Sequence, residues 1–140
     1  TTTRLSVIEH QSGVLVEGIL VAFTVQSAVF RVLLTISHDD GREDHEERFR
    51  RIATRDKLNL EEAEEATRHR EEHMDLRYQE FYGLRYPELF ENDLYHLVVN
   101  TRNNPPEKVA EIVIEAYGKY KKGEWNKKPR HRTLSIFHIE

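Results

Sequence analysis

The sequence has no cysteine among its 140 residues, which excludes disulfide cross-links and thiol chemistry. A chain without cysteine also fits a reducing compartment. Long apolar runs are lacking too, because none approaches the roughly 20 residues that a membrane-spanning helix needs. The first residues do not have the charged, apolar and small-residue segments of a signal peptide. From the sequence we therefore expect a cytoplasmic protein with no membrane partner.

An excess of positive charge is also missing, since the formal net charge is −4 although 33% of the residues are charged. A general nucleic-acid-binding protein is usually more basic, so we expect no nucleic-acid partner. A local cluster of arginines can still hold a single phosphate group. No serine or threonine lies in a nucleophile elbow, so the sequence does not indicate a hydrolase.

Arginine interleaved with acid marks residues 46–83, which we predict to form two helices. The arginines that share a helix face by their spacing are Arg48, Arg51 and Arg55 on the first helix and Arg70 and Arg77 on the second. A guanidinium group is ionised and offers a planar fork of donors. Convergent arginines therefore suit a polyanion such as the phosphate chain of a nucleotide.

A structural interpretation of the same arginines stays open. Glu and Arg at helical spacing most often make a solvated face of weak ion pairs, each worth roughly 0.2–0.5 kcal/mol. Arg70, however, falls in the gap of an apolar stripe, where a buried arginine would need an anionic partner. The residues of that stripe are Leu60, Ala63, Ala66, Met74, Tyr78 and Phe81.

Strands and helices alternate along the predicted chain. Apolar runs predict strands over residues 14–17, 29–36 and 95–100, with a further short strand at 5–8, and the helices are expected over residues 19–25, 44–54, 60–82 and 105–120. Residues 85–93 are expected to be a loop. This order predicts an α/β fold with a parallel sheet and helices on both of its faces. We expect one domain over residues 1–120 and a basic tail over residues 121–140.

Helix-capping signals support two of these helices. Asn59 and Glu62 have the spacing of a capping box, and Gly83 is placed to end the same helix. Asn104 is expected to cap the last helix, with Pro105 at its first position. That helix should bury one face, formed by Val109, Ile112, Val113, Ala116 and Tyr117.

The eight histidines offer no compact set of metal ligands. His69 and His73 have the spacing of a helical metal-binding pair, but a second ligand segment is missing, and solvated helix histidines are the simpler interpretation. We therefore predict no metal site. Trp125 and Phe137 lie in the basic tail, where we expect them to pack locally.

Four segments together resemble one known group, the cytidylate kinase-like P-loop kinases and especially the archaeal-type cytidylate kinases. RFRRIATRD at residues 48–56 is similar to an arginine-rich run in the mobile lid of that family, and REEHMDLRYQEFYG at residues 70–83 is similar to the lid helix that follows. YHLVVNT at residues 95–101 resembles a late strand of the family. The next stretch, NPPEKVAEIVIEAY, resembles its terminal helix. The similarity covers roughly residues 14–120 in the same order.

The resemblance implies transfer of phosphate from ATP to CMP, with ATP and Mg²⁺ as cofactors. It places the matching lid arginines on the ATP phosphates and on the charge that develops on the transferred group; they are Arg48, Arg51, Arg55, Arg70 and Arg77. That role fits the chemistry, because phosphoryl transfer depends mainly on positioning and charge neutralisation.

The departures from the family pattern are as informative as the matches. The sequence contains no G-x-x-x-x-G-K-[ST], the P-loop that holds ATP and Mg²⁺. It has Ile19 where the family has an arginine that contacts the monophosphate, and His96 where the family has an acid in its late strand. The chain therefore looks like the C-terminal part of such a kinase, with lid helices and without the P-loop.

Two functions remain open on the sequence. Either the chain is a nucleotide-binding part of a cytidylate kinase that is inactive alone, with ATP and CMP as its nucleotide partners, or it is a non-enzymatic remnant that serves as a protein-interaction or oligomerising module. In the family's sheet the P-loop strand lies between the strands that match residues 14–17 and 29–36. We expect residues 5–8 or a second copy of the chain to fill that place, or the two strands to pair directly. The partners are accordingly a further copy of the chain or a missing N-terminal segment.

Overall fold

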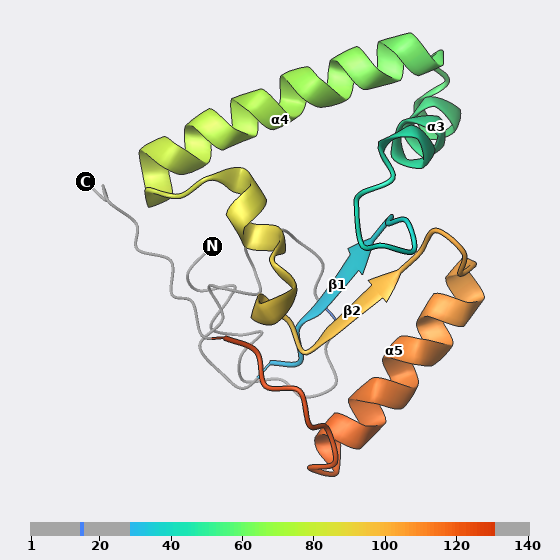
Figure 1. Ribbon diagram of the computed structural model, residues 1–140, viewed down its shortest axis with the longest axis vertical. Coiled ribbons are helices and arrows are strands. Elements are labelled where there is room, and N and C mark those ends of the chain that lie inside the picture. The colour runs from blue at the N-terminus through green and yellow to red at the C-terminus, as the bar shows by residue number, and fades with distance from the viewer. Residues whose placement is uncertain (1–14, 16–28, 131–140) are drawn as a thin grey trace.

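The computed structural model describes residues 15 and 29–130 (Figure 1). Its elements, in chain order, are β1 (Val32–Thr35), α3 (His45–Asp56), α4 (Leu60–Tyr82), the 3₁₀ helices η1 (Tyr86–Phe90) and η2 (Asn92–Leu94), β2 (Leu97–Asn100) and α5 (Pro106–Lys121). The predicted strands at 5–8 and 14–17, apart from Leu15, and the predicted helix at 19–25 lie outside the described residues. Among the described residues, no helix is long and apolar enough to cross a membrane.

The two described strands form a parallel pair, with Val32 beside Leu97 and Thr35 beside Asn100. Helix α5 packs on β2, whereas α3 and α4 pack on each other and α4 packs on η1. Figure 1 shows α3 beyond the ends of the strands at which the arrows point. The protein is thus an α/β protein with a small parallel sheet, as predicted, and the α3–α4 pair lies past the carboxyl ends of its strands.

Helix α3 is positioned by signals at both of its ends. The buried Asp44 side chain accepts a hydrogen bond from the Glu47 N–H group at 3.1 Å and caps the helix. Acidic residues in the first turn and Arg55 in the last turn complement the helix dipole. At the other end, Lys57 adopts a left-handed conformation with φ 58°. The helix therefore runs two residues further than the predicted range of 44–54.

Helix α4 has the predicted bounds because its capping signals are local. The Glu62 N–H group donates to Asn59 Oδ1 at 2.8 Å, and the Asn59 N–H group donates to Glu62 Oε1 at 3.1 Å, which completes the predicted capping box. Gly83 ends the helix with φ 68°, a conformation that costs glycine little. Its N–H group donates to the Gln79 carbonyl at 3.1 Å.

The buried face of α4 differs from the predicted stripe. Ala63 and Thr67 are its buried residues, whereas Leu60, Ala66 and Phe81 are exposed. Met74 and Tyr78 are half-buried because they lie near the packed face of the helix. The stripe was predicted from apolar character alone, and the packed face includes polar side chains that contact other elements.

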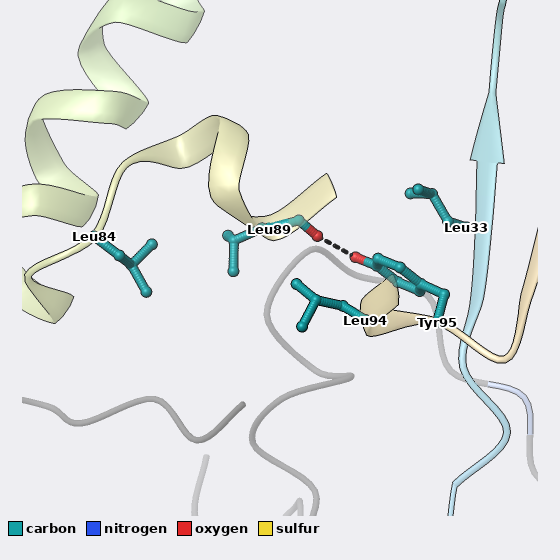
Figure 2. Packing of buried hydrophobic residues seen from close by; sticks show 5 residues of the cluster. All are labelled: Leu33, Leu84, Leu89, Leu94 and Tyr95. Carbon is teal, nitrogen blue, oxygen red and sulfur yellow. Dashed lines mark hydrogen bonds between the residues drawn. The ribbon is translucent and has the colours of Figure 1, made fainter. Parts of the chain in front are cut away.

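The region predicted as a loop over residues 85–93 carries part of the core. Its two 3₁₀ helices place Leu89 and Leu94 at full burial, and both pack with Leu33 of β1, Leu84 and Tyr95. In Figure 2 the Tyr95 hydroxyl points at the end of η1, where it donates to the Leu89 carbonyl at 2.5 Å. This buried cluster joins the end of α4 to the sheet.

The last helix starts one residue later than predicted. Pro106 is its first residue, Pro105 is the N-cap with an extended ψ of 163°, and Asn104 instead donates from its side chain to the Asn100 carbonyl at 2.7 Å. A residue before proline disfavours helical geometry, so Pro106 pushes Pro105 out of the helix. On the predicted inner face, Ala116 is buried but Tyr117 is exposed, so the prediction for Tyr117 is wrong.

Residues 124–130 of the predicted basic tail fold back on the domain. Trp125 packs edge-on against Phe30 with ring centroids 5.6 Å apart, and its indole N–H group donates to the His96 carbonyl at 3.0 Å. Arg130 forms ion pairs with Glu91 and Asp93. Trp125 thus packs on the domain, as the prediction of a packed side chain requires, but through Phe30 and His96, which are distant in the chain, rather than locally. Phe137 lies outside the described residues.

Candidate phosphate-binding site

Arg51 joins α3 to the end of β2. Its two terminal nitrogens donate to the hydroxyl and the carbonyl of Thr101, each at 2.9 Å, and its Nε donates to Glu47 Oε1 at 3.1 Å. The side chain is 37% exposed. Each nitrogen of this guanidinium therefore makes one hydrogen bond with the protein, and Arg51 holds α3 in place over the sheet edge.

A second contact fixes the start of α3 at the same edge. The capping carboxylate of Asp44 accepts from Arg102 Nε at 2.6 Å, and His38 Nε2 lies 3.8 Å from it. The N–H group of Glu47, with smaller contributions from Arg102 and His38, lowers the pKa of Asp44. Asp44 is therefore a carboxylate at neutral pH. Its contact with Arg102 holds the first turn of α3 against the residues that follow β2.

Arg48 bridges three segments of the chain. One terminal nitrogen binds Glu43 in the loop before α3, and the other binds Glu71 on α4. The guanidinium also lies over the Phe49 ring, 5.6 Å from its centroid. Only 22% of the Arg48 side chain is exposed. This arginine therefore ties α3 to α4.

Arg55 makes fewer contacts with the rest of the protein than Arg48 or Arg51. It binds the neighbouring Asp56 through Nε at 2.9 Å and a terminal nitrogen at 3.1 Å, and 65% of its side chain is exposed. The hydrogen bond from Arg55 lowers the pKa of Asp56, and the charge of Arg70 on α4 adds a smaller lowering. Arg55 therefore pairs with Asp56 at the end of α3, and the charge of Arg70 acts more weakly on the same carboxylate.

Arg70 and Arg77 are both exposed, and neither makes a hydrogen bond or ion pair with another residue of the described chain. The prediction that Arg70 is buried on an apolar stripe is wrong, because the side of α4 that faces α3 carries the next residue, Glu71, rather than Arg70. Arg77 lies two turns farther along α4, beside Tyr78. Burial raises the pKa of Tyr78, and the charge of Arg77 opposes that rise.

Tyr86 lies close to the arginines and was missed by the sequence analysis. Burial raises the pKa of Tyr86, and among the charges that act on it, Glu71 raises it while Arg70 and Arg48 lower it. The ring packs against Tyr78 and Phe90, with centroids 5.4 and 5.0 Å away. The hydroxyl is therefore protonated near neutral pH. No local sequence pattern marks this tyrosine.

The structure thus separates the five predicted arginines by their partners. Those held by other segments are Arg48 and Arg51, and those exposed at the surface are Arg55, Arg70 and Arg77. Contacts place Arg48 between α3 and α4 and Arg55 beside Asp56 at the end of α3, while Arg70 is exposed on α4 next to Glu71 in the chain. Arg51 faces Thr101 instead, and Arg77 lies farther along α4. Sequence reasoning also missed Glu43 and Thr101, whose contacts with the arginines span 5 and 50 residues.

Position 96 has a structural role in this chain. His96 Nδ1 accepts the Arg31 N–H group at 2.9 Å, and its ring packs against Phe30 and Tyr120 with centroids 5.2 and 5.1 Å away. Burial lowers the pKa of His96. A neutral ring therefore fits this aromatic cluster, where a carboxylate would be desolvated. Ile19, the other departure from the family pattern, lies outside the described residues.

Side chains suited to metal binding do not gather in the described residues, which hold no group of three or more His, Asp or Glu side chains able to bind a metal ion. Mg²⁺ in phosphoryl-transfer sites is bound partly by substrate phosphates and by few carboxylates. Four acidic residues of α3, α4 and the loop before α3 are paired with arginines. Those residues are Glu43, Glu47, Asp56 and Glu71.

Two curated proteins are similar to the chain. A cytidylate kinase from Archaeoglobus fulgidus is 31% identical over 114 residues, which cover 81% of this chain and 58% of that protein. A cytidylate kinase from Haloquadratum walsbyi is 37% identical over 70 residues, or 50% of this chain and 35% of that protein. No family model matches the chain, and no solved structure matches it significantly. The chain spans little more than half the length of the first relative, and over that stretch it is cytidylate kinase-like, which confirms the resemblance predicted from its sequence.

Proposed function

We propose that this chain supplies the lid of a nucleoside monophosphate kinase that transfers phosphate from ATP to CMP. The observation that carries the proposal is the packing of α3 on α4, which places Arg48, Arg55 and Arg70 on one helix pair, with Arg48 paired to Glu71 across it and Arg55 and Arg70 exposed. The two similar proteins that are named cytidylate kinase support the choice of reaction. By this proposal the ligand is the phosphate chain of a nucleotide, with ATP and Mg²⁺ as the cofactors.

The arginines would have different roles in phosphate binding, according to the contacts that each makes in the structure. Arg55 and Arg70 would bind phosphate first, because little protein structure has to be broken to free them. Arg51 would hold α3 at the sheet edge, while Arg48 links the two helices until phosphate reaches it. Arg77 remains a candidate from the resemblance alone. Fixed guanidinium groups stabilise the charge that develops during phosphoryl transfer, which is the largest contribution that such a site can make.

We expect the 140-residue chain alone not to phosphorylate CMP. Its sequence offers no P-loop, and hence no backbone cradle, lysine or Mg²⁺-binding hydroxyl for ATP. Each tenfold in rate corresponds to about 1.4 kcal/mol of barrier, so losing several such contacts removes many orders of magnitude. A coupled assay with ATP, Mg²⁺ and CMP tests this expectation, and robust turnover would contradict it.

The binding test is a titration of ATP at low and high ionic strength. We expect weak binding that salt weakens further, because the contacts are between exposed charges. Replacing Arg55 or Arg70 by alanine should lower the affinity by several fold. Arg68→Ala is the matched control, because Arg68 is an exposed arginine of α4 that pairs with Glu64 on the same helix. Equal effects of Arg70→Ala and Arg68→Ala would remove Arg70 from the site.

A second candidate function is a non-enzymatic interaction or oligomerising module. It is favoured by the ion pairs that already occupy Arg48 and Arg51, and by the exposed apolar side chains Ile114 and Tyr117 on α5. The same titration separates the two functions. If ATP does not bind at either ionic strength and sedimentation shows a stable dimer, the interaction module is the better description.

A further inference from the structure

Arg48 has both terminal nitrogens occupied by carboxylates. Glu43 binds one and Glu71 binds the other, and these two acids come from the loop before α3 and from α4. A phosphate binds a guanidinium best through the same fork of two nitrogens. The fork of Arg48 is therefore filled by protein oxygens at the place where the proposed function requires phosphate oxygens.

We propose that Glu71, assisted by Glu43, acts as a competitive gate that must leave Arg48 before a nucleotide phosphate can bind there. This inference rests on the proposed function and adds a regulatory exchange to the same site. In the closed gate, the Glu71 carboxylate neutralises Arg48 and ties α4 to α3. In the open gate, phosphate takes the place of the carboxylate, and the tie between the two helices is released.

The two acids are accessible enough to exchange. The side chains of Glu43 and Glu71 are 40% and 41% exposed, so water can solvate each carboxylate once it leaves. A polyphosphate carries more charge than one carboxylate and offers several acceptor oxygens, so it can displace the acid. Arg70 is adjacent to Glu71 in the chain and exposed, so it adds a second positive charge for the incoming anion.

The gate predicts that removing a negative charge at one position strengthens anion binding more than removing it elsewhere. Glu71→Gln keeps the shape of the side chain and removes its charge. The matched control is Glu64→Gln, because Glu64 lies on the same helix with a similar exposure of 39% and pairs with Arg68 rather than Arg48. Both changes alter the net charge equally, so their difference reports on Arg48.

The test is calorimetric titration of the full 140-residue chain with inorganic tripolyphosphate at low ionic strength. We expect Glu71→Gln to bind roughly threefold to fivefold more tightly than Glu64→Gln, the factor that an exposed ion pair supports. Adding Arg48→Ala should abolish this gain, because the gate acts through Arg48 alone. Circular dichroism confirms folding, and Glu43→Gln serves as the second variant if Glu71→Gln does not fold.

Each result decides the inference. Equal affinities of Glu71→Gln and Glu64→Gln overturn the gate, as does a gain that persists with Arg48→Ala. If Arg70→Ala still weakens binding in that case, the proposed phosphate site stands while the gate fails. If tripolyphosphate binds none of the variants, both the gate and the phosphate site are wrong.

Discussion

Replacing Arg51 by alanine should destabilise the fold, although the residue was predicted from the sequence as a ligand-binding arginine. The substitution removes both hydrogen bonds to Thr101 and the contact with Glu47 at 3.1 Å. Thr101 would lose partners at the point where the chain leaves β2. The stability of the α3–α4 pair on the sheet edge should therefore fall, with or without a nucleotide.

The magnitude follows from the contacts and the exposure. Hydrogen bonds that involve a charged group contribute about 1.5–3 kcal/mol when buried, and the 37% exposure of Arg51 reduces that value. We expect a loss of about 1–2 kcal/mol in the free energy of unfolding. With a urea dependence of about 1–3 kcal/mol per molar, the unfolding midpoint should fall by roughly 0.5–1 M.

The assay is urea unfolding followed by circular dichroism, with Arg55→Ala as the matched control on the same helix. Arg55 is 65% exposed and binds only the neighbouring Asp56 among the described residues, so its removal should cost at most about 0.5 kcal/mol. A midpoint for Arg51→Ala that equals the midpoint for Arg55→Ala would refute the claim that Arg51 anchors α3.

Two further predictions concern the core. Leu89→Ala should lower the free energy of unfolding by about 2–5 kcal/mol because Leu89 is fully buried. The control Leu76→Ala, at an exposed position of α4, should change it by about 0.5 kcal/mol or less. Urea unfolding of both variants tests this difference. Burial raises the pKa of Tyr95 to about 12 from a usual value of 10.0, so the unfolded state ionises first and stability falls as pH rises from about 10 to 12. Tyr95→Phe should lower the free energy of unfolding by about 1–2 kcal/mol at pH 7. Above pH 10 its stability should fall less steeply than that of the parent protein or of the Tyr117→Phe control. An equal fall in all three proteins would contradict the assignment.

Local signals were predictable from the sequence because their partners lie within a few residues. The capping box of Asn59 and Glu62 and the stop at Gly83 set both ends of α4 as predicted. The same kind of reasoning failed at Asn104, where two successive prolines compete for the first helical position. The second proline prevails because it restricts the backbone of the first.

Contacts between residues that are distant in the chain could not be predicted from the sequence. The packed face of α4 contains Thr67 and borders Glu71, which an apolar pattern cannot identify, because Glu71 is placed there by Arg48 of another helix. The core of η1 and η2 was missed for a similar reason. Leu89 and Leu94 are buried by Leu33, more than 50 residues away in the chain, and a short polar segment with a proline resembles a loop.

The arginines of the site show that one contact can serve stability and oppose binding at the same time. The carboxylate of Glu71 stabilises the α3–α4 pair by neutralising Arg48, and it also competes with any phosphate for the same nitrogens. Thr101 does not compete in this way, because its hydroxyl and carbonyl carry no charge to hold Arg51 against a polyanion. Changes that strengthen the Arg48 pair should therefore stabilise the lid at the expense of affinity, whereas changes that strengthen the Arg51 contact should stabilise α3 with little effect on phosphate binding at Arg48.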